Sequence, residues 1–278
     1  MLMSENLSLS THPEYVAWHA GTHRLQYLNK CIEHYYSTPL IPDISTADTM
    51  YNEWYLQVGH SAAANVMHAF QCSWLMRVNR ALDMACGHGR VLRHLVNLFP
   101  DAEFHACDLD REGVDFCQET FGIKGIYSVE DLTKVDFVTK YDLIWVGSLF
   151  THTSQEITKK WLSHLTQFLT ETGIMIATFH GRWSETVAAQ APYINPQAWS
   201  EILSEYRATG YGYRDYERSE NHQYIQGSYG ISLSSASAIA KIVEAVEGVR
   251  IFSYQERAWA DHQDVMVIGK PAHNMAWK

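Results

Sequence analysis

The amino-acid sequence predicts an α/β fold built on one mostly parallel sheet, and three observations support this prediction. An apolar stretch, Ala81–Ala85, leads into a glycine turn and then into apolar residues at helical spacing. Strand-like and amphipathic segments then alternate as far as Phe179, which favours parallel strands with right-handed crossovers. Finally, strand-like segments at 249–256 and 264–269 are joined by a short connection, which favours a hairpin and an antiparallel last strand.

Composition and charge limit the class of protein. Of the 278 residues, 46% are hydrophobic and 19% are charged, as in globular proteins. The net charge of −10 argues against a nucleic-acid-binding surface, which needs a basic stripe. Five cysteines without a Cys-x-x-Cys motif favour reduced thiols. His19 and His23 have a possible metal spacing, but no third ligand is evident, so we expect no metal site.

The first 80 residues form a helical extension in this interpretation. Apolar residues recur at helical spacing over 13–36 and again over 49–77, with an interruption near Gly59. Two interpretations of the second segment stay open. Its aromatic stripe packs on the edge of the sheet, or Tyr51, Tyr55 and Gly59 close over a bound ligand. The start of the chain has no basic and apolar leader, and no stretch approaches the ~18 apolar residues of a membrane span, so we expect a cytoplasmic protein.

The turn after the first strand carries the most specific pattern. Asp83 precedes Gly87 and Gly89, where the missing Cβ atoms let a ligand approach the backbone. The next strand ends in Asp108, which is placed to accept hydrogen bonds from a ribose diol. A dinucleotide fingerprint needs a third glycine or alanine, and Leu92 stands there instead. The pattern therefore favours a nucleoside that carries a cationic group near Asp83.

Asp83, Gly87, Gly89 and Asp108 resemble the motifs of class I S-adenosylmethionine (SAM)-dependent methyltransferases. The resemblance implies a Rossmann-like sheet with an antiparallel last strand, SAM as cofactor and S-adenosylhomocysteine as its product. It also implies that the acid ending the second strand holds the ribose. Asp131 matches a loosely defined position near the adenine, and a solvated loop acid is an equal alternative. The cofactor-binding positions that we expect are Tyr55, Gly59, Asp83, Ala85, Cys86, Gly87, Gly89, Asp108, Leu109, Asp131 and Ser148.

The remaining elements follow in order along the chain. Gly122 is placed to end the helix expected at 110–121 as a left-handed cap. The region of Ser234 and Ser235 is placed to start the last expected helix. In a sheet of this kind, ligands bind at the carboxyl ends of the strands. The segments that we expect are helices at 91–99, 110–121, 154–171 and 234–246, and strands at 102–107, 125–129, 141–147 and 174–179.

The resemblance covers about 81–270, so we expect a methyltransferase domain at 81–278 behind the extension at 1–80. Within it, 182–233 is an insert where the family usually continues directly into its next helix. The insert holds nine tryptophan and tyrosine residues and no lysine. Such residues suit a cover over the substrate. The alternatives are an extension of the core or a dimer contact.

His152 and His180 follow the fourth and fifth expected strands, so both are candidates for a general base. The alternative for each is a structural histidine bonded to nearby backbone. His222 and Tyr224 are weaker candidates. We expect both imidazoles to lie in one space beside the cofactor sulfur, under the insert and next to Trp183.

The sequence thus predicts a SAM-dependent methyltransferase acting on a small-molecule acceptor through an oxygen, nitrogen or carbon atom. The alternatives are an NAD-dependent oxidoreductase and a SAM-binding protein without turnover. We expect neither a nucleic acid nor a membrane as partner, and a monomer or homodimer.

Overall fold

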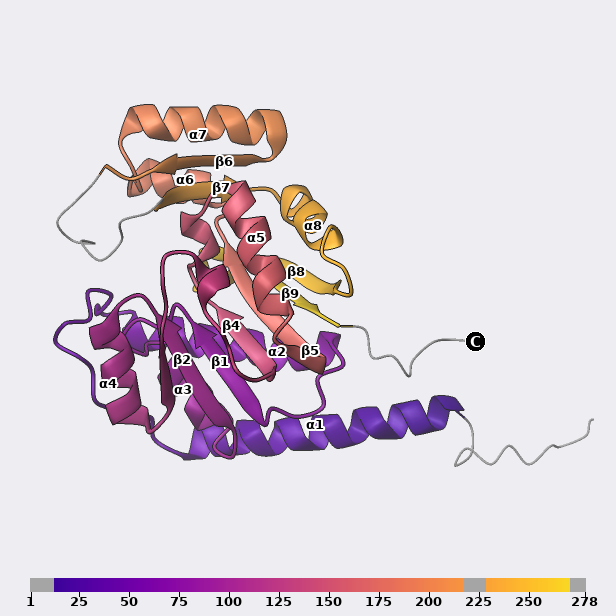
Figure 1. Cartoon of the computed structure of the whole chain (residues 1–278). Helices are drawn as coiled ribbons and strands as arrows, with labels where there is room; N and C mark the ends of the chain where they lie inside the picture. The colour runs from indigo at the N-terminus through magenta and orange to yellow at the C-terminus, as the bar shows by residue number, and fades with distance from the viewer. Residues whose placement is uncertain (1–12, 218–228, 271–278) are drawn as a thin grey trace, which may run out of the picture.

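The computed structural model describes residues 13–217 and 229–270 and contains two sheets (Figure 1). The strands of the larger sheet are β1 Arg80–Met84, β2 Glu103–Asp108, β3 Lys124–Tyr127, β4 Tyr141–Val146, β5 Leu169–Phe179, β8 Arg250–Trp259 and β9 Gln263–Gly269. Their order is β3-β2-β1-β4-β5-β9-β8. The neighbouring strands β3, β2, β1, β4 and β5 are parallel to one another, whereas β9 is antiparallel to both β5 and β8. The predicted fold class and its antiparallel last strand are confirmed.

Helices cover both faces of this sheet. They are α1 Pro13–Ser37, α2 Tyr55–Cys72, α3 Leu92–Leu98, α4 Arg111–Phe121, α5 Gln155–Thr166 and α8 Ala236–Glu244. The first four share one core, in which Phe70 and Leu95 pack with Trp145 of β4. The other two share a second core, in which Leu162 and Ile239 pack with the sheet. Because successive strand residues point to opposite faces, each central strand contributes apolar side chains to both cores.

Several predicted boundaries are confirmed by their caps. Helix α4 ends at Gly122, which has φ +65° and donates its N–H to the carbonyl of Gln118. Helix α8 begins after Ser235, whose side chain accepts the N–H of Ala238. Helix α3 ends at Leu98, just before Pro100, as the sequence predicts.

Some predicted features of the elements are wrong. The helix expected at 154–171 ends at Thr166, and β5 begins at Leu169, not Ile174. Leu169 pairs with Tyr141 at the start of β4 and is 1% exposed, so the sheet takes residues that the periodicity gave to the helix. Also, Gly59 does not interrupt the second helical segment, which is continuous over α2.

The insert folds into its own small layer, made of α6 Ser184–Gln190, α7 Pro196–Thr209, β6 Tyr211–Asp215 and β7 Gly230–Ser234. Figure 1 shows this layer above the large sheet, beyond the end of β5, with α7 outermost. Ile202, Ile231 and Leu233 form its core. The N–H of Ser234 donates to the carbonyl of His180, which joins the insert to the end of β5. His222 and Tyr224 lie outside the described residues.

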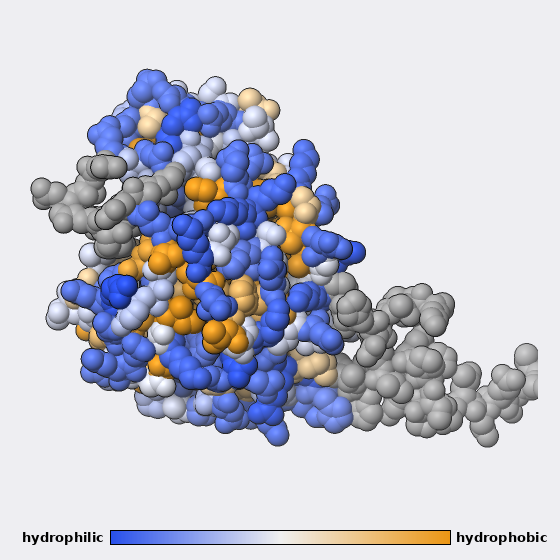
Figure 2. Space-filling model, viewed as in Figure 1, coloured by the Kyte–Doolittle hydropathy of each residue, from blue (hydrophilic) through white to orange (hydrophobic). Residues whose placement is uncertain are grey.

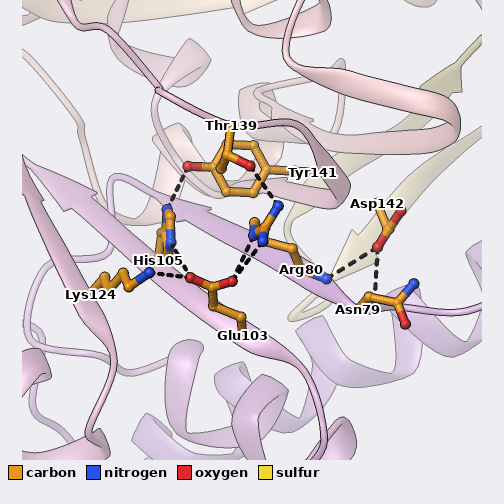
Figure 3. Close-up of polar contacts among 8 residues, drawn as sticks. All are labelled: Asn79, Arg80, Glu103, His105, Lys124, Thr139, Tyr141 and Asp142. Carbon is orange, nitrogen blue, oxygen red and sulfur yellow. Dashed lines mark hydrogen bonds and ion pairs between the residues drawn. The ribbon is translucent and has the colours of Figure 1, made fainter.

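A polar cluster joins the amino ends of β1 to β4 (Figure 3). Glu103 lies at its centre and contacts Lys124, Arg80 and His105, and these contacts lower the pKa of its carboxyl to about 2. The hydroxyl of Tyr141 lies 2.7 Å from Nδ1 of His105. This edge of the sheet is opposite to the carboxyl ends, so the cluster holds strands together away from the expected ligand site.

The surface seen from the viewpoint of Figure 1 is mostly polar, with apolar side chains gathered across its middle below the insert (Figure 2). In the described part of the chain, no helix combines the length and the apolar character needed to cross a membrane.

Candidate functional site

A cavity of about 560 Å³ lies at the carboxyl ends of the central strands. Its wall comes from the ends of β1, β2 and β4, from the loop before α2, from the insert and from the β8–β9 hairpin. The expected site residues that line it are Asp83, Ala85, Cys86, Gly87, Asp108, Leu109, Ser148 and His152. The carboxyl edge of a parallel sheet is where ligands bind in folds of this kind.

The turn after β1 has a left-handed backbone at three positions. Ala85, Gly87 and Gly89 have φ of +61°, +50° and +78°. A Cβ at Gly87 would meet no described atom within 4 Å, so its backbone is open to the cavity. A Cβ at Gly89 would lie 2.5 Å from the ring of Phe121. Gly89 therefore allows the turn to pack on α4 and does not line the cavity.

Asp108 at the end of β2 holds this turn in place. One carboxylate oxygen accepts the N–H of Gly87 at 2.8 Å, and the other accepts the N–H of Asp110 at 2.9 Å. Burial raises the pKa of Asp108, and the two N–H donors oppose that shift. Each oxygen keeps a second lone pair for a ligand hydroxyl.

Asp83 is the most unusual group in the cavity. It is 1% exposed, and its Oδ2 atom has no hydrogen-bond partner among the described residues. Burial, and then the nearby Asp108, raise its pKa to about 8. A buried carboxyl without a partner is costly unless a cation or donor meets it. The site therefore favours a ligand that brings a cationic donor to this point.

Two charged residues that the sequence did not single out also line the cavity. Asp48 precedes α2 and accepts the hydroxyl of Tyr55 at 2.7 Å, and Arg90 follows the glycine turn. Burial lowers the pKa of Arg90, and the charge of Asp48 opposes this shift. Tyr55 is buried behind Asp48 and does not line the cavity, so it orients a wall residue. For Arg90, the one feature of the sequence that indicates a place in the cavity wall is its position directly after Gly89.

Gly59 and Asp131 also lie outside the cavity wall. A Cβ at Gly59 would clash with the His94 ring and would lie 2.5 Å from the carbonyl oxygen of Arg90, so this glycine lets α2 pack against α3 and the turn before it. Asp131 caps a short helical turn by accepting the N–H of Thr133 and pairs with Lys160. Its neighbour Glu130 lines the cavity instead.

The end of the cavity nearest the insert is aromatic. Tyr216 and Tyr229 of the insert line it together with His152. The ring centroid of His152 lies 4.7 Å from that of Tyr229 and 6.0 Å from that of Tyr216. His152 donates from Nδ1 to the carbonyl of Gly230 at 2.7 Å, so Nε2 is the acceptor nitrogen of the neutral ring.

His180 lies behind His152, with 6.5 Å between the two ring centroids. It is 4% exposed and does not line the cavity. Burial, with His152 and His262 nearby, holds the pKa of His180 well below its ordinary value, so the ring is neutral. The ring of Trp183 is covered by the Arg257 guanidinium at 3.6 Å and lies outside the cavity wall as well.

Within residues 13–217 and 229–270, no group of three or more histidine, cysteine, aspartate or glutamate side chains is arranged to hold a metal ion.

Known proteins resemble this chain in both sequence and fold. Residues 81–173 match the family model described as "Methyltransferase domain". The fatty-acid O-methyltransferase of Mycolicibacterium smegmatis is 25% identical over 130 residues. That alignment covers 45% of this chain, and the chain spans less than half, 43%, of that relative.

Solved structures with the same fold cover most of the chain. A SAM-dependent methyltransferase from Clostridium acetobutylicum superposes with a TM-score of 0.50 at 13% identity, covering 80% of this chain and 93% of that one. The PH0226 protein from Pyrococcus horikoshii gives 0.55 at 12% identity, covering 86% and 99%. Residues 81–173 thus match a methyltransferase domain in sequence, and the described chain has the fold of these solved methyltransferase structures.

Proposed function

We propose that this chain is a SAM-dependent methyltransferase that acts on a small-molecule acceptor. The observation that carries the proposal is the buried Asp83 carboxyl, which lies in the cavity of a methyltransferase domain without a partner among the described residues. SAM carries an ammonium group that can occupy this position. The dinucleotide NAD offers anionic phosphates, which bring no cation to this carboxyl and would be repelled by it once it ionises.

The charged residues of the cavity fit the two ends of SAM. Asp108 offers two carboxylate oxygens to a ribose diol, held by the backbone N–H groups of Gly87 and Asp110. Once a bound ammonium group displaces the Asp83 proton, Asp83 and Arg90 carry opposite charges that match the two groups of an amino acid. The open backbone at Gly87 lets the ligand lie against the turn after β1.

When bound, SAM supplies a methyl group on a sulfonium centre, so the protein needs no covalent step. The chain has to align the acceptor atom with that methyl group and exclude water. Trp145, Trp161 and Trp259 line the cavity with the two insert tyrosines and provide an apolar wall for this purpose. A cavity of this size with an aromatic wall favours a small acceptor over a protein or nucleic acid.

His152 is the residue that we assign as general base. Its Nδ1 hydrogen is held by Gly230, so Nε2 can take a proton from an acceptor hydroxyl, phenol or ammonium. His180 behind it stays neutral and adds no positive charge that would lower the basicity of His152. We therefore assign His180 a supporting role.

The acceptor class, the partners and the location belong to the same proposal. The relative named for fatty-acid O-methylation supports an oxygen acceptor on an apolar molecule. The net charge of −10 disfavours nucleic acid. We propose that the protein acts in the cytoplasm as a monomer or homodimer.

Ligand-induced stabilisation tests the cofactor. SAM or S-adenosylhomocysteine at ~100 times its dissociation constant should add ~2.7 kcal/mol to the free energy of unfolding, visible as a raised melting temperature. NAD and NADP should not stabilise the protein. Stabilisation by NAD alone would favour the oxidoreductase. Binding of SAM without methylation of any acceptor in a broad screen with labelled methyl groups would favour a binding protein without turnover.

A further inference from the structure

A closed ring of three hydrogen bonds holds Ser148 at the cavity wall. The N–H of Ser148 donates to Oγ1 of Thr178 at 2.8 Å, and Thr178 donates to Oε1 of Gln263 at 2.7 Å. The Gln263 amide then donates from Nε2 to Oγ of Ser148 at 2.8 Å. Thr178 belongs to β5, Gln263 begins β9, and Ser148 follows β4, so residues from three strand ends meet in this ring.

The ring stabilises an unfavourable backbone conformation. Ser148 has φ +56°, the left-handed region, which costs ~1–3 kcal/mol for a residue other than glycine. Its carbonyl oxygen also accepts the hydroxyl of Thr151 at 2.6 Å. With its N–H, carbonyl and side chain all bonded, Ser148 is fixed in both position and orientation.

The direction of the ring follows from Thr178, which is completely buried. Its hydroxyl oxygen already accepts the N–H of Ser148, so its own hydrogen needs an acceptor. The carbonyl side of the Gln263 amide is the acceptor that the described residues offer. If the amide were turned over, a buried hydroxyl hydrogen would be left unpaired, at a cost of ~1–3 kcal/mol. The NH₂ side of Gln263 therefore faces Ser148.

It follows that Ser148 acts as a donor toward the cavity. Its oxygen accepts from Gln263, so its hydrogen points elsewhere, and Ser148 lines the cavity. In the parallel register, Met84 pairs with Val146, which places Ser148 beside the turn at its Asp83 end, away from Asp108. A donor at this end fits an anionic ligand group, as does Arg90.

We propose that Gln263 is a positioning residue that fixes the Ser148 hydroxyl as a hydrogen-bond donor to the carboxylate of the cofactor's amino-acid group. This inference rests on the proposed function, because it takes the ligand to be SAM or S-adenosylhomocysteine. Gln263 itself need not touch the ligand, since it acts by deciding which way the Ser148 hydrogen points.

Two probes separate this role from a general loss of structure. S-adenosylhomocysteine has the amino-acid group, and 5′-methylthioadenosine lacks it. In Gln263→Glu, the carboxylate accepts the Ser148 hydrogen and so reverses the donor. We expect calorimetry to show about tenfold or greater loss of affinity for S-adenosylhomocysteine, as for a bond to a charged group, and little change for 5′-methylthioadenosine. Gln118→Glu on α4, outside the cavity wall, is the matched control and should change neither affinity.

A double-mutant cycle decides whether Gln263 acts through Ser148. Ser148→Ala should lose the same selectivity, and adding Gln263→Glu to it should cost nothing more. A further loss in that background would mean that the new charge acts directly on the ligand, and equal losses for both probes would mean a structural role; either result overturns the inference. If Gln263→Glu does not fold, Gln263→Met, which removes the amide and leaves the Thr178 oxygen in place for the Ser148 N–H, takes its place in the cycle. Failure of the unaltered chain to bind S-adenosylhomocysteine would instead overturn the proposed function, and this inference with it.

Discussion

The buried carboxyl of Asp83 gives the fold a pH dependence that one substitution should remove. Asp83→Asn keeps the size of the side chain and takes away its ionisation. The pKa of Asp83 is raised from 3.8 to about 8, by burial and then by Asp108. Between these values the folded chain keeps a proton that the unfolded chain has released. The free energy of unfolding therefore falls as the pH rises from about 4 to about 8, and the full cost is present above that range.

The size of the effect follows from the two pKa values. At ~1.4 kcal/mol for each pH unit in this interval, ionising Asp83 in the folded chain costs up to ~6 kcal/mol. The asparagine variant carries no such cost. Its advantage in the free energy of unfolding over the unaltered chain should therefore grow by roughly 4 kcal/mol between pH 5 and pH 9.

Urea denaturation followed by tryptophan fluorescence at pH 5, 7 and 9 measures this difference. Asp131→Asn is the control, because Lys160 and Thr133 lower the pKa of Asp131 to about 2. The stabilisation from that carboxylate is lost only as the pH falls toward 2. The difference in the free energy of unfolding between Asp131→Asn and the unaltered chain should therefore stay constant from pH 5 to 9. A difference for Asp83→Asn that is equally constant would refute the argument that Asp83 is buried in its protonated form.

The same substitution tests where the ligand's ammonium group lies. At pH 7, about nine-tenths of the Asp83 carboxyls carry a proton if the pKa is about 8. A cation that binds beside this group should displace that proton. Calorimetry with S-adenosylhomocysteine in buffers of different ionisation enthalpy should show more proton release from the unaltered chain than from Asp83→Asn. Equal release would place the ammonium group elsewhere.

Three other substitutions test separate parts of the site. Asp108→Asn leaves one carbonyl oxygen where two carboxylate oxygens stood, so affinity for S-adenosylhomocysteine should fall about tenfold or more by calorimetry; unchanged affinity in a folded variant would place the ribose elsewhere. His152→Gln should keep that affinity within about twofold and lower turnover of an ionisable acceptor ~10² or more; full turnover would exclude it as the base. Gly59→Ala should lower the free energy of unfolding by ~1–3 kcal/mol in urea, because the new Cβ meets His94, and a variant of full stability would contradict that contact.

The sequence predicts the fold well wherever local patterns and tertiary packing agree. Glycine at Gly122 and serine at Ser235 cap helices through their own backbone and side-chain chemistry, so those boundaries could be predicted. The end of α5 could not, because Leu169 satisfies a helical period as well as a strand and only its pairing with Tyr141 decides between them. Gly59 reads as a break in a helix, yet its reason is the close approach of another chain segment.

The site shows the same division. Asp83 and Asp108 were found because they adjoin strand ends and a glycine turn. Asp48 could not be found, because the loop before α2 folds over the cavity only in three dimensions. The sequence places Tyr55 in the right region, but its hydroxyl bonds to Asp48 and so holds the wall from behind. His152 and His180 do lie together, but only packing decides which of them faces the cavity.

The β8–β9 hairpin has a consequence for how the protein is made. It supplies Trp259 and Gln263 to the site, and it is held to α2 by Asn65, which donates to the carbonyl of Ala258 across 193 residues of chain. Until residues 250–269 have left the ribosome, β5 is an open edge with its apolar residues uncovered, and the cavity lacks one wall. A nascent chain at that point lacks part of the site, and its uncovered strand edge is prone to pair with other chains and aggregate.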